Sequence, residues 1–216
     1  MRGSLILIEG LDRAGKSTQC ERLSQRLQGD IIKFPDRSTP VGQLLDRYLT
    51  DASFNLPDET VHLLFSANRW EVVAQLEDKL LKGKHIIMDR YIYSGIAYSL
   101  AKRTTPRISN SQWLYAPDRG LPKPDITLFL TLDLEEQANR KGWGDERYEK
   151  APFQAKVKEN FDQLFSANSI IDNGVVEVID VNHKSIDEVT DAIWNKVTTN
   201  GADKPTDAPI SRFALQ

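Results

Sequence analysis

The sequence contains little cysteine and little histidine. Its 216 residues include one cysteine, Cys20, and three histidines, His62, His85 and His183. A single thiol cannot form a disulfide within the chain, which excludes a small disulfide-stapled domain and favours a reducing compartment. The histidines are scattered, without the Cys/His or carboxylate spacing of a zinc site. The sequence therefore predicts neither a disulfide framework nor a zinc centre.

A long hydrophobic run and a strong excess of one charge are also missing. No apolar run approaches the roughly 18 residues that span a bilayer, and the first residues lack the apolar core of a signal peptide. The formal net charge of −3 argues against broad attachment to nucleic acid, although a local basic pocket for phosphates remains allowed. We expect a soluble protein without nucleic-acid or membrane partners, located in the cytoplasm, with the nucleus left open as a second compartment.

Short β-rich runs alternate with longer helical patterns along most of the chain. With 40% hydrophobic residues, residues 1–198 can form one α/β domain, in which helices cover both faces of a five-stranded parallel sheet. The periodicity is lost after residue 198, so residues 199–216 are expected to form a flexible tail. The expected strands are 5–8, 31–34, 85–88, 126–132 and 175–181, and the expected helices are 16–28, 41–49, 58–82, 94–102, 112–116, 153–166 and 186–197.

A glycine-rich loop directly follows the first expected strand. The residues from Gly10 to Ser17 read Gly-Leu-Asp-Arg-Ala-Gly-Lys-Ser, which matches the phosphate-binding loop Gly-x-x-x-x-Gly-Lys-Ser and opens the first expected helix. The two glycines let backbone N–H groups turn toward phosphate oxygens. Lys16 can reach the β- and γ-phosphates, and Ser17 can bind Mg²⁺. The sequence therefore predicts a site for a nucleoside triphosphate.

Two other expected strands end in charged residues. The third ends in Asp89-Arg90-Tyr91, at the sheet edge where ligands of open α/β sheets bind. Asp89 can hold Mg²⁺ or its water, and Arg90 can grip a phosphoryl group in a planar, bidentate contact. The second strand ends in Phe34-Pro35-Asp36-Arg37, where a proline-stiffened turn directs Arg37 toward the same edge. Arg37 and Arg90 are thus expected to face the same site and to bind an anion there.

Several short motifs together resemble the thymidylate kinases, which phosphorylate dTMP with ATP. The elements Phe-Pro-x-Arg (34–37), Phe-x-x-x-Arg (65–69), Asp-Arg-Tyr (89–91) and Tyr-Ser-Gly (93–95) occur in the family's order and at compatible spacings. The resemblance spans residues 5 to about 197 and is nearest to the eukaryotic type, which carries an arginine, here Arg13, within the phosphate loop. It implies a P-loop kinase fold with a lid, ATP and dTMP as substrates, Mg²⁺ as cofactor and a homodimer.

The resemblance also implies roles for individual residues. Phe65 would stack on thymine and Arg69 would donate to a thymine carbonyl; four residues apart on a helix, they share one face. Tyr98 would crowd the ribose 2′ position, and Asp12 would accept a hydrogen bond from the 3′-hydroxyl. The implied catalytic residues are Arg13, Lys16, Asp89 and Arg90; the ATP-binding residues are Gly10, Arg13, Ala14, Gly15, Lys16, Ser17, Thr18 and Arg140; the dTMP-binding residues are Asp12, Phe34, Arg37, Phe65, Arg69, Arg90, Ser94, Gly95, Tyr98 and Tyr148; and the metal-binding residues are Ser17 and Asp89.

A charged, glycine-containing segment at about 140–149 joins two expected helices and fits a closing lid. By resemblance, Tyr148 reaches the dTMP and either Arg140 or Arg147 approaches ATP; a solvated charged loop is the alternative. Two other functions stay open. A deoxynucleoside kinase shares the phosphate loop and an Asp-Arg strand end, but its acceptor is a neutral nucleoside. A GTPase switch would carry an Asn-Lys-x-Asp guanine signature, which the sequence lacks.

Overall fold

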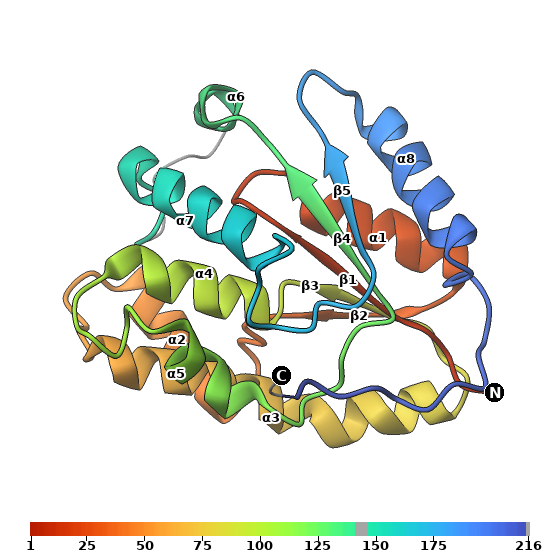
Figure 1. Cartoon of the computed structure of the whole chain (residues 1–216), viewed down its shortest axis with the longest axis horizontal. Coiled ribbons are helices and arrows are strands. Elements are labelled where there is room, and N and C mark those ends of the chain that lie inside the picture. The colour runs from red at the N-terminus through yellow and green to blue at the C-terminus, as the bar shows by residue number, and fades with distance from the viewer. Residues whose placement is uncertain (141–146, 215–216) are drawn as a thin grey trace.

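The computed structural model describes residues 1–140 and 147–214. They form a five-stranded sheet in the order β2-β3-β1-β4-β5, in which every neighbouring pair is parallel (Figure 1). The predicted α/β class and the five predicted strands are confirmed. The strands are β1 (Leu5–Gly10), β2 (Asp30–Lys33), β3 (Ile86–Asp89), β4 (Ile126–Thr131) and β5 (Val176–Asp180).

Helices cover both faces of the sheet, because the buried strands alternate their side chains between two apolar clusters. Leu5 and Leu7 of β1 pack into one cluster, and Ile6 and Ile8 into the other. In Figure 1, α1 and α8 lie on one face, and α3, α4, α5 and α7 lie on the other. The helices are α1 (Lys16–Leu27), α2 (Pro40–Thr50), α3 (Asp58–Leu81), α4 (Ile92–Lys102), α5 (Ser111–Tyr115), α6 (Leu134–Asn139), α7 (Ala151–Leu164) and α8 (Ile186–Thr199), with a 3₁₀ turn η1 (Ala116–Asp118).

The strand order brings the charged strand ends together. In the parallel register Ile8 of β1 lies opposite Asp89 of β3, and Asp89 lies opposite Lys33 of β2. The phosphate loop therefore leaves β1 beside Asp89 and Arg90, as expected for the carboxyl edge of an open sheet. None of the described helices combines the length and the apolar content that a membrane-spanning segment needs.

The C-terminal segment differs from the expected flexible tail. Residues 200–214 pass the N-terminus and run beside α3, and Thr206 forms an antiparallel bridge with Arg2 (Figure 1). Phe213 is 3% exposed and donates its backbone N–H to the carbonyl of Leu121. One buried aromatic residue leaves no periodic pattern in a sequence, which is why the docking could not be predicted. The central part of the expected lid, 141–146, and residues 215–216 lie outside the described residues.

Phe213→Ala is expected to destabilise the protein by about 3–5 kcal/mol, because it leaves a cavity among aromatic rings. The Phe213 ring centroid lies 6.1 Å from that of Tyr91, 6.0 Å from that of Tyr93 and 6.3 Å from that of Tyr115. Urea denaturation measures the change. Ile186→Ala, at an exposed position of α8, is the control and should change stability by less than about 0.5 kcal/mol. A loss below about 1 kcal/mol for Phe213→Ala would show that the C-terminal segment is only loosely docked.

A second residue with a large expected effect on stability is His62 of α3, which is fully buried. Its Nε2 lies 2.7 Å from the Leu114 carbonyl oxygen, and its Nδ1 lies 2.8 Å from Ser99 Oγ. A carbonyl only accepts, so Nε2 carries the proton and Nδ1 accepts from the Ser99 hydroxyl. Burial lowers the pKa of His62 to about 4, from an ordinary value of 6.5.

Acidification from pH 6.5 to 4 is therefore expected to destabilise the protein through His62. In this window the unfolded histidine binds a proton that the folded one does not, so stability falls as the pH falls. The contribution approaches about 3 kcal/mol at the acid end. Denaturant titrations across this range should show a shallower pH dependence for His62→Gln than for the wild type. His183→Gln is the matched control, since that side chain is 89% exposed. Parallel curves for the wild type and His62→Gln would contradict the prediction.

Candidate active site

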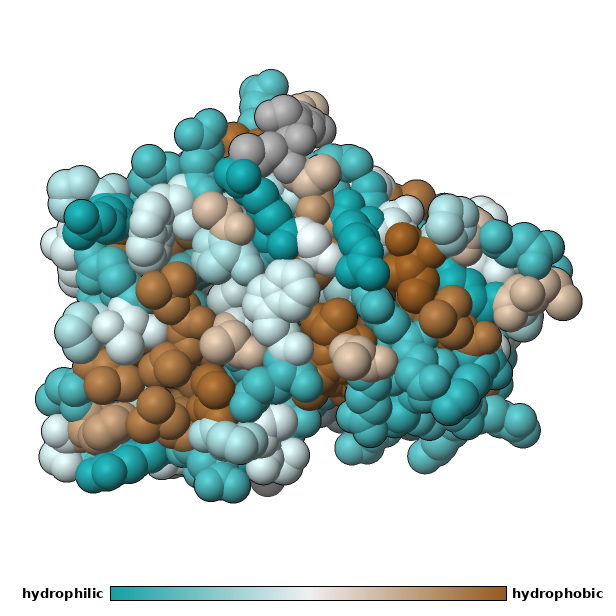
Figure 2. All heavy atoms as spheres, turned by 90° about the horizontal axis from the view of Figure 1, so that it is seen from below, coloured by the Kyte–Doolittle hydropathy of each residue, from teal (hydrophilic) through white to brown (hydrophobic). Residues whose placement is uncertain are grey.

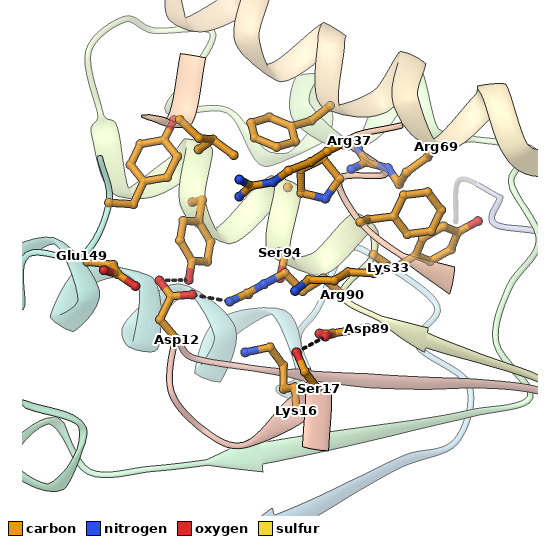
Figure 3. Close-up of a pocket in the computed structure, with 18 of the residues that line it drawn as sticks. Asp12, Lys16, Ser17, Lys33, Arg37, Arg69, Asp89, Arg90, Ser94 and Glu149 are labelled. Carbon is orange, nitrogen blue, oxygen red and sulfur yellow. Dashed lines mark hydrogen bonds and ion pairs between the residues drawn. The ribbon is translucent and has the colours of Figure 1, made fainter. Parts of the chain in front are cut away.

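A pocket of about 550 Å³ opens at the carboxyl ends of β1, β2 and β3 (Figure 3). It brings together most of the residues singled out from the sequence. Of those residues, Gly10, Ala14 and Arg140 are not part of its lining within the described chain. The predicted residues that line it are Asp12, Arg13, Gly15, Lys16, Ser17, Thr18, Phe34, Arg37, Phe65, Arg69, Asp89, Arg90, Ser94, Gly95, Tyr98 and Tyr148.

Both glycines of the phosphate loop have a positive φ, a backbone conformation that glycine adopts readily. Gly15 has a φ of 88° and precedes the first residue of α1, so the first free N–H groups of the helix face the pocket. Gly10 has a φ of 150°, and a Cβ there would lie 2.5 Å from the Leu130 carbonyl oxygen. Lys16 donates from Nζ to the Leu11 carbonyl at 2.6 Å. Burial lowers the pKa of Lys16 to about 8, and the nearby Arg90 guanidinium adds to this effect.

Ser17 and Asp89 lie side by side at the base of the loop. Ser17 Oγ donates to Asp89 Oδ2 at 2.6 Å (Figure 3). Asp89 is 2% exposed, and its Oδ1 is buried without a hydrogen-bond partner among the described residues. A buried carboxylate oxygen without a partner costs free energy unless a ligand satisfies it, and oxygen donors are those that Mg²⁺ prefers. The pair fits a hard divalent cation, although no group of three His, Cys, Asp or Glu residues in the described chain forms a metal cage by itself.

Arg90 and Asp12 form an ion pair in the middle of the pocket. Arg90 Nη2 donates to Asp12 Oδ1, and Arg90 Nη1 donates to Ser94 Oγ at 3.0 Å (Figure 3). Asp12 Oδ2 accepts from Tyr98 Oη at 2.9 Å and from Gln154 Nε2 at 2.8 Å. Burial would raise the pKa of Asp12, but Arg90 and these hydrogen bonds hold it below its usual value. The phosphate loop is thereby tied to α4 and α7 through one carboxylate.

Glu9, which was not identified from the sequence, holds the start of α4 and the side chain of Ser94 in place. It is fully buried in β1 and accepts from the backbone N–H groups of Tyr91 at 2.8 Å and Ser94 at 3.0 Å. Its Oε2 also accepts from Ser94 Oγ at 2.6 Å. Glu9 thus caps the N-terminus of α4 from a neighbouring strand, in place of a local capping residue. The available signal was a lone glutamate between an apolar strand and the phosphate loop.

Arg90 has a left-handed backbone, with a φ of 71°, and so does Arg13, with a φ of 66°. Such a φ is uncommon for arginine and persists where surrounding contacts hold it. For Arg90, those contacts are the backbone bond from its N–H to the Ile8 carbonyl and the side-chain bonds to Asp12 and Ser94. Two arginines that line the same pocket therefore have an uncommon backbone conformation.

The far end of the pocket combines an aromatic ring with a guanidinium. Phe65 and Arg69, from one face of α3, both line it. Arg69 is 2% exposed and is paired with Asp118, a partner that the sequence reasoning did not identify. Other lining residues were not assigned a role from the sequence, although Pro35, Tyr91 and Glu149 belong to segments that it singled out. The lining residues without an assigned role are Lys33, Pro35, Leu49, Val61, Tyr91, Ser99, Lys102 and Glu149.

The arginines at the two ends of the expected lid make different contacts. Arg140 donates from Nη1 to the Arg13 carbonyl at 2.7 Å, which braces the phosphate loop from outside the pocket. Arg147 donates to the carbonyls of Tyr48 at 2.8 Å and Phe54 at 2.9 Å, away from the phosphate loop. An approach of Arg140 to ATP stays a prediction. The alternative approach of Arg147 to ATP also stays a prediction; in this structure its contacts fasten residue 147 to the end of α2 and to the loop after it.

Comparison with known proteins identifies the family of the chain. A family model described as thymidylate kinase matches residues 8–193. The chain is 46% identical to the thymidylate kinase of Danio rerio, over 89% of this chain and 92% of the relative. It is 44% identical to the thymidylate kinase of Homo sapiens, over 78% of this chain and 80% of the relative. A solved thymidylate kinase from Candida albicans superposes with a TM-score of 0.93 at 52% identity, covering 98% of both chains. The chain therefore belongs to the thymidylate kinase family, the ATP-dependent phosphotransferases that act on dTMP.

Proposed function

We propose that dTMP lies across the pocket with its base against Phe65 and Arg69 and its phosphate beside Arg37 and Arg90. The single observation that carries this binding mode is the placement of the partly buried Arg90 guanidinium between the phosphate loop and the nucleotide pocket. A fixed cation there suits an acceptor that is already an anion. It does not suit the neutral nucleoside that a deoxynucleoside kinase accepts.

The chain then catalyses transfer by positioning and charge neutralisation. The loop amides and Lys16 hold the ATP phosphates, and Arg13 neutralises charge on the transferring group. Ser17 and Asp89 would hold Mg²⁺, which would supply positive charge to neutralise the phosphate groups. Closure of the segment that carries Tyr148 and Glu149 would exclude water from the two substrates.

Asp12 is proposed to accept a hydrogen bond from the 3′-hydroxyl of dTMP. An ionised carboxylate offers about four lone-pair sites, of which Arg90, Tyr98 and Gln154 use three. One site is thus left for the sugar. Because Asp12 belongs to the phosphate loop, sugar fit and catalytic geometry are coupled.

A dTMP analogue whose 3′-hydroxyl is replaced by a bulkier group without a donor is expected to lose at least roughly tenfold in kcat. The substituent leaves one carboxylate site unpaired and pushes the loop that also carries Arg13. Steady-state turnover of dTMP and the analogue, both at saturation, measures the effect. In Asp12→Ala the ratio of the two kcat values should move toward one. Equal kcat values in the wild type would contradict the coupling.

Base selection is proposed to depend on the Arg69 donor. Thymine presents a carbonyl acceptor to it, whereas cytosine presents an amine, so dCMP should be a far poorer substrate. dUMP differs from dTMP by one methyl group, which should change the binding free energy by about 1–3 kcal/mol. Because the Candida albicans relative is described as having a broad substrate specificity, purine monophosphates belong among the acceptors to compare.

A coupled assay of ADP release with ATP, Mg²⁺ and a panel of nucleosides and monophosphates tests this proposal. dTMP should give the highest kcat/KM, and thymidine should give almost none. Replacing ATP by GTP separates a kinase from a GTPase-type switch, because only the switch would hydrolyse GTP without an acceptor. Comparable kcat/KM values for dTMP and dCMP, or for dTMP and thymidine, would overturn the binding mode.

We also propose a homodimer, and the expected cytoplasmic location stays a prediction. Figure 2 shows apolar residues gathered over part of the face seen from below, the side along which α3 runs in Figure 1. The exposed apolar residues of α3 include Leu63, Trp70 and Leu81. A contiguous exposed apolar surface is typical of subunit contacts. Light scattering should give twice the mass of one chain, and Leu63→Asp should reduce it.

A further inference from the structure

A buried ion pair lies behind the base end of the pocket. Arg69 of α3 is 2% exposed, and Asp118 of η1 is fully buried. Arg69 donates from Nε to Asp118 Oδ1 at 3.0 Å and from Nη2 to Asp118 Oδ2 at 2.7 Å, a bidentate contact. Ser66, one turn earlier on α3, donates from Oγ to the same Oδ1 at 2.7 Å. Two of the three nitrogens of the guanidinium are therefore committed to one carboxylate.

The opposite side of the guanidinium lies against α4, at a residue without a side chain. A Cβ on Gly95 would come within 3.0 Å of Arg69 Nη1 and 3.1 Å of Nη2, closer than side chains normally approach. The guanidinium is thus held between the Asp118 carboxylate and the backbone of Gly95. Its remaining nitrogen, Nη1, has no hydrogen-bond acceptor among the described residues, and Arg69 lines the pocket. The side chain can present that one donor to a ligand.

We propose that Asp118 is a positioning residue that sets base specificity, by fixing Arg69 so that Nη1 alone faces the nucleotide base. This inference rests on the proposed binding mode of dTMP. An unpaired arginine has five N–H donors and many rotamers, so it could turn away from a base that offers it no acceptor. A clamped arginine cannot turn away. A base with a carbonyl at this position gains a charge-assisted hydrogen bond, and a base with an amine there meets a donor.

The burial of the pair supports a role in specificity. Removing two charges from water costs about as much as their attraction returns, so a buried ion pair is weak evidence for a gain in stability. Asp118 is also held in place from α3, since Trp70 Nε1 donates to the carbonyl of the preceding residue, Pro117, at 2.8 Å. The 3₁₀ turn, Ser66 and Trp70 together fix the carboxylate that fixes Arg69.

Asp118→Asn is the decisive variant, because asparagine has nearly the same size and shape as aspartate but cannot accept the bidentate contact from Arg69. The amide oxygen can accept one guanidinium N–H, while the amide NH₂ faces another donor. We expect KM for dTMP to rise roughly 10- to 100-fold, the equivalent of one charge-assisted hydrogen bond. We also expect the dTMP-to-dCMP ratio of kcat/KM to fall by at least roughly tenfold, because the released guanidinium no longer excludes the amine. KM for ATP should change less than about twofold, since Asp118 does not line the pocket and its side chain contacts Arg69 and Ser66 of α3.

The matched control is Asp125→Asn. Asp125 also accepts a bidentate contact from an arginine, from Arg2 Nη1 at 2.8 Å and Nη2 at 2.6 Å, but neither residue lines the pocket. That variant should lower the melting temperature while it leaves the dTMP-to-dCMP ratio at its wild-type value. Ser66→Ala is a milder second variant, in case Asp118→Asn does not fold. It removes one hydrogen bond to Asp118 Oδ1 and should lower the same ratio by roughly two- to fivefold.

The measurement separates this inference from the proposed function. Turnover of dTMP by the wild type tests the function, whereas the change of the dTMP-to-dCMP ratio in the variants tests the role of Asp118. A folded Asp118→Asn enzyme with the wild-type KM for dTMP and the wild-type ratio would overturn the inference. The inference also fails if Asp125→Asn shifts the ratio as much as Asp118→Asn does, since the effect would then reflect general destabilisation.

Discussion

Arg90→Ala is expected to lower kcat/KM for dTMP by roughly a thousandfold, the largest effect of any single substitution proposed for this protein. The estimate assumes that two charge-assisted hydrogen bonds to the acceptor phosphate are lost. Burial opposes the charge of Arg90, yet Tyr98, Asp12 and Asp89 raise its pKa, so the guanidinium stays charged throughout the working pH range. Without it, Asp12 and Asp89 would repel the incoming phosphate.

Arg90→Lys serves as the control for this prediction. It keeps the positive charge but loses the planar fork that reaches Asp12 Oδ1, Ser94 Oγ and the Gly10 carbonyl together. Its kcat/KM should lie between those of the wild type and Arg90→Ala. Initial-rate kinetics over a range of dTMP concentrations measure both variants, and a thermal melt confirms that each remains folded. An Arg90→Ala enzyme within tenfold of the wild type would show that the acceptor phosphate binds elsewhere.

Arg13→Ala is expected to lower kcat by roughly 10²–10³-fold while KM for dTMP stays nearly unchanged. The reason is that a cation acting on the transferring phosphoryl group stabilises the transition state more than the bound substrates. In this structure Arg13 Nη2 donates to Glu149 Oε1 at 3.1 Å, and the side chain has further contacts. In its proposed role, Arg13 would exchange this carboxylate for phosphate oxygens during the reaction.

Full steady-state kinetics with both substrates varied check this second prediction. Arg22→Ala, on the outer surface of α1, is the matched control, since it removes an exposed arginine paired with Asp187. It should leave both kinetic constants within about twofold of their wild-type values. If Arg13→Ala instead raised KM for dTMP and left kcat unchanged, Arg13 would be a ground-state binder and the assigned role would be wrong.

The residues that the sequence identified belong to contiguous motifs. The phosphate loop, Phe-Pro-x-Arg and Asp-Arg-Tyr each act through a short stretch of chain whose backbone is set locally, by glycine, by proline or by a strand end. The hydrophobic runs also located the strands and main helices to within a few residues, since period-2 and period-3.6 patterns follow directly from which faces are buried. The short helix α6 was missed, because six residues carry too little pattern.

The residues that support those motifs could not be identified in the same way. Glu9 and Ser94 are 85 residues apart, and Arg69 and Asp118 are 49 residues apart. A glutamate in a strand or an aspartate in a turn looks ordinary until the neighbouring element is known. Only the sheet order and the packing of α3 against η1 show which buried charge meets which partner.

By itself, the sequence determined the α/β fold, the glycine-rich loop and most of the residues that line the pocket, because these depend on local backbone geometry and on hydrophobic periodicity. The tertiary structure decided how those residues are held: Arg90 by Asp12 and Ser94, and Arg69 by Asp118. It also decided that the C-terminal segment docks through Phe213. These contacts join segments far apart in the chain, and their free energy comes from burial and charge pairing that exist only once the elements have packed.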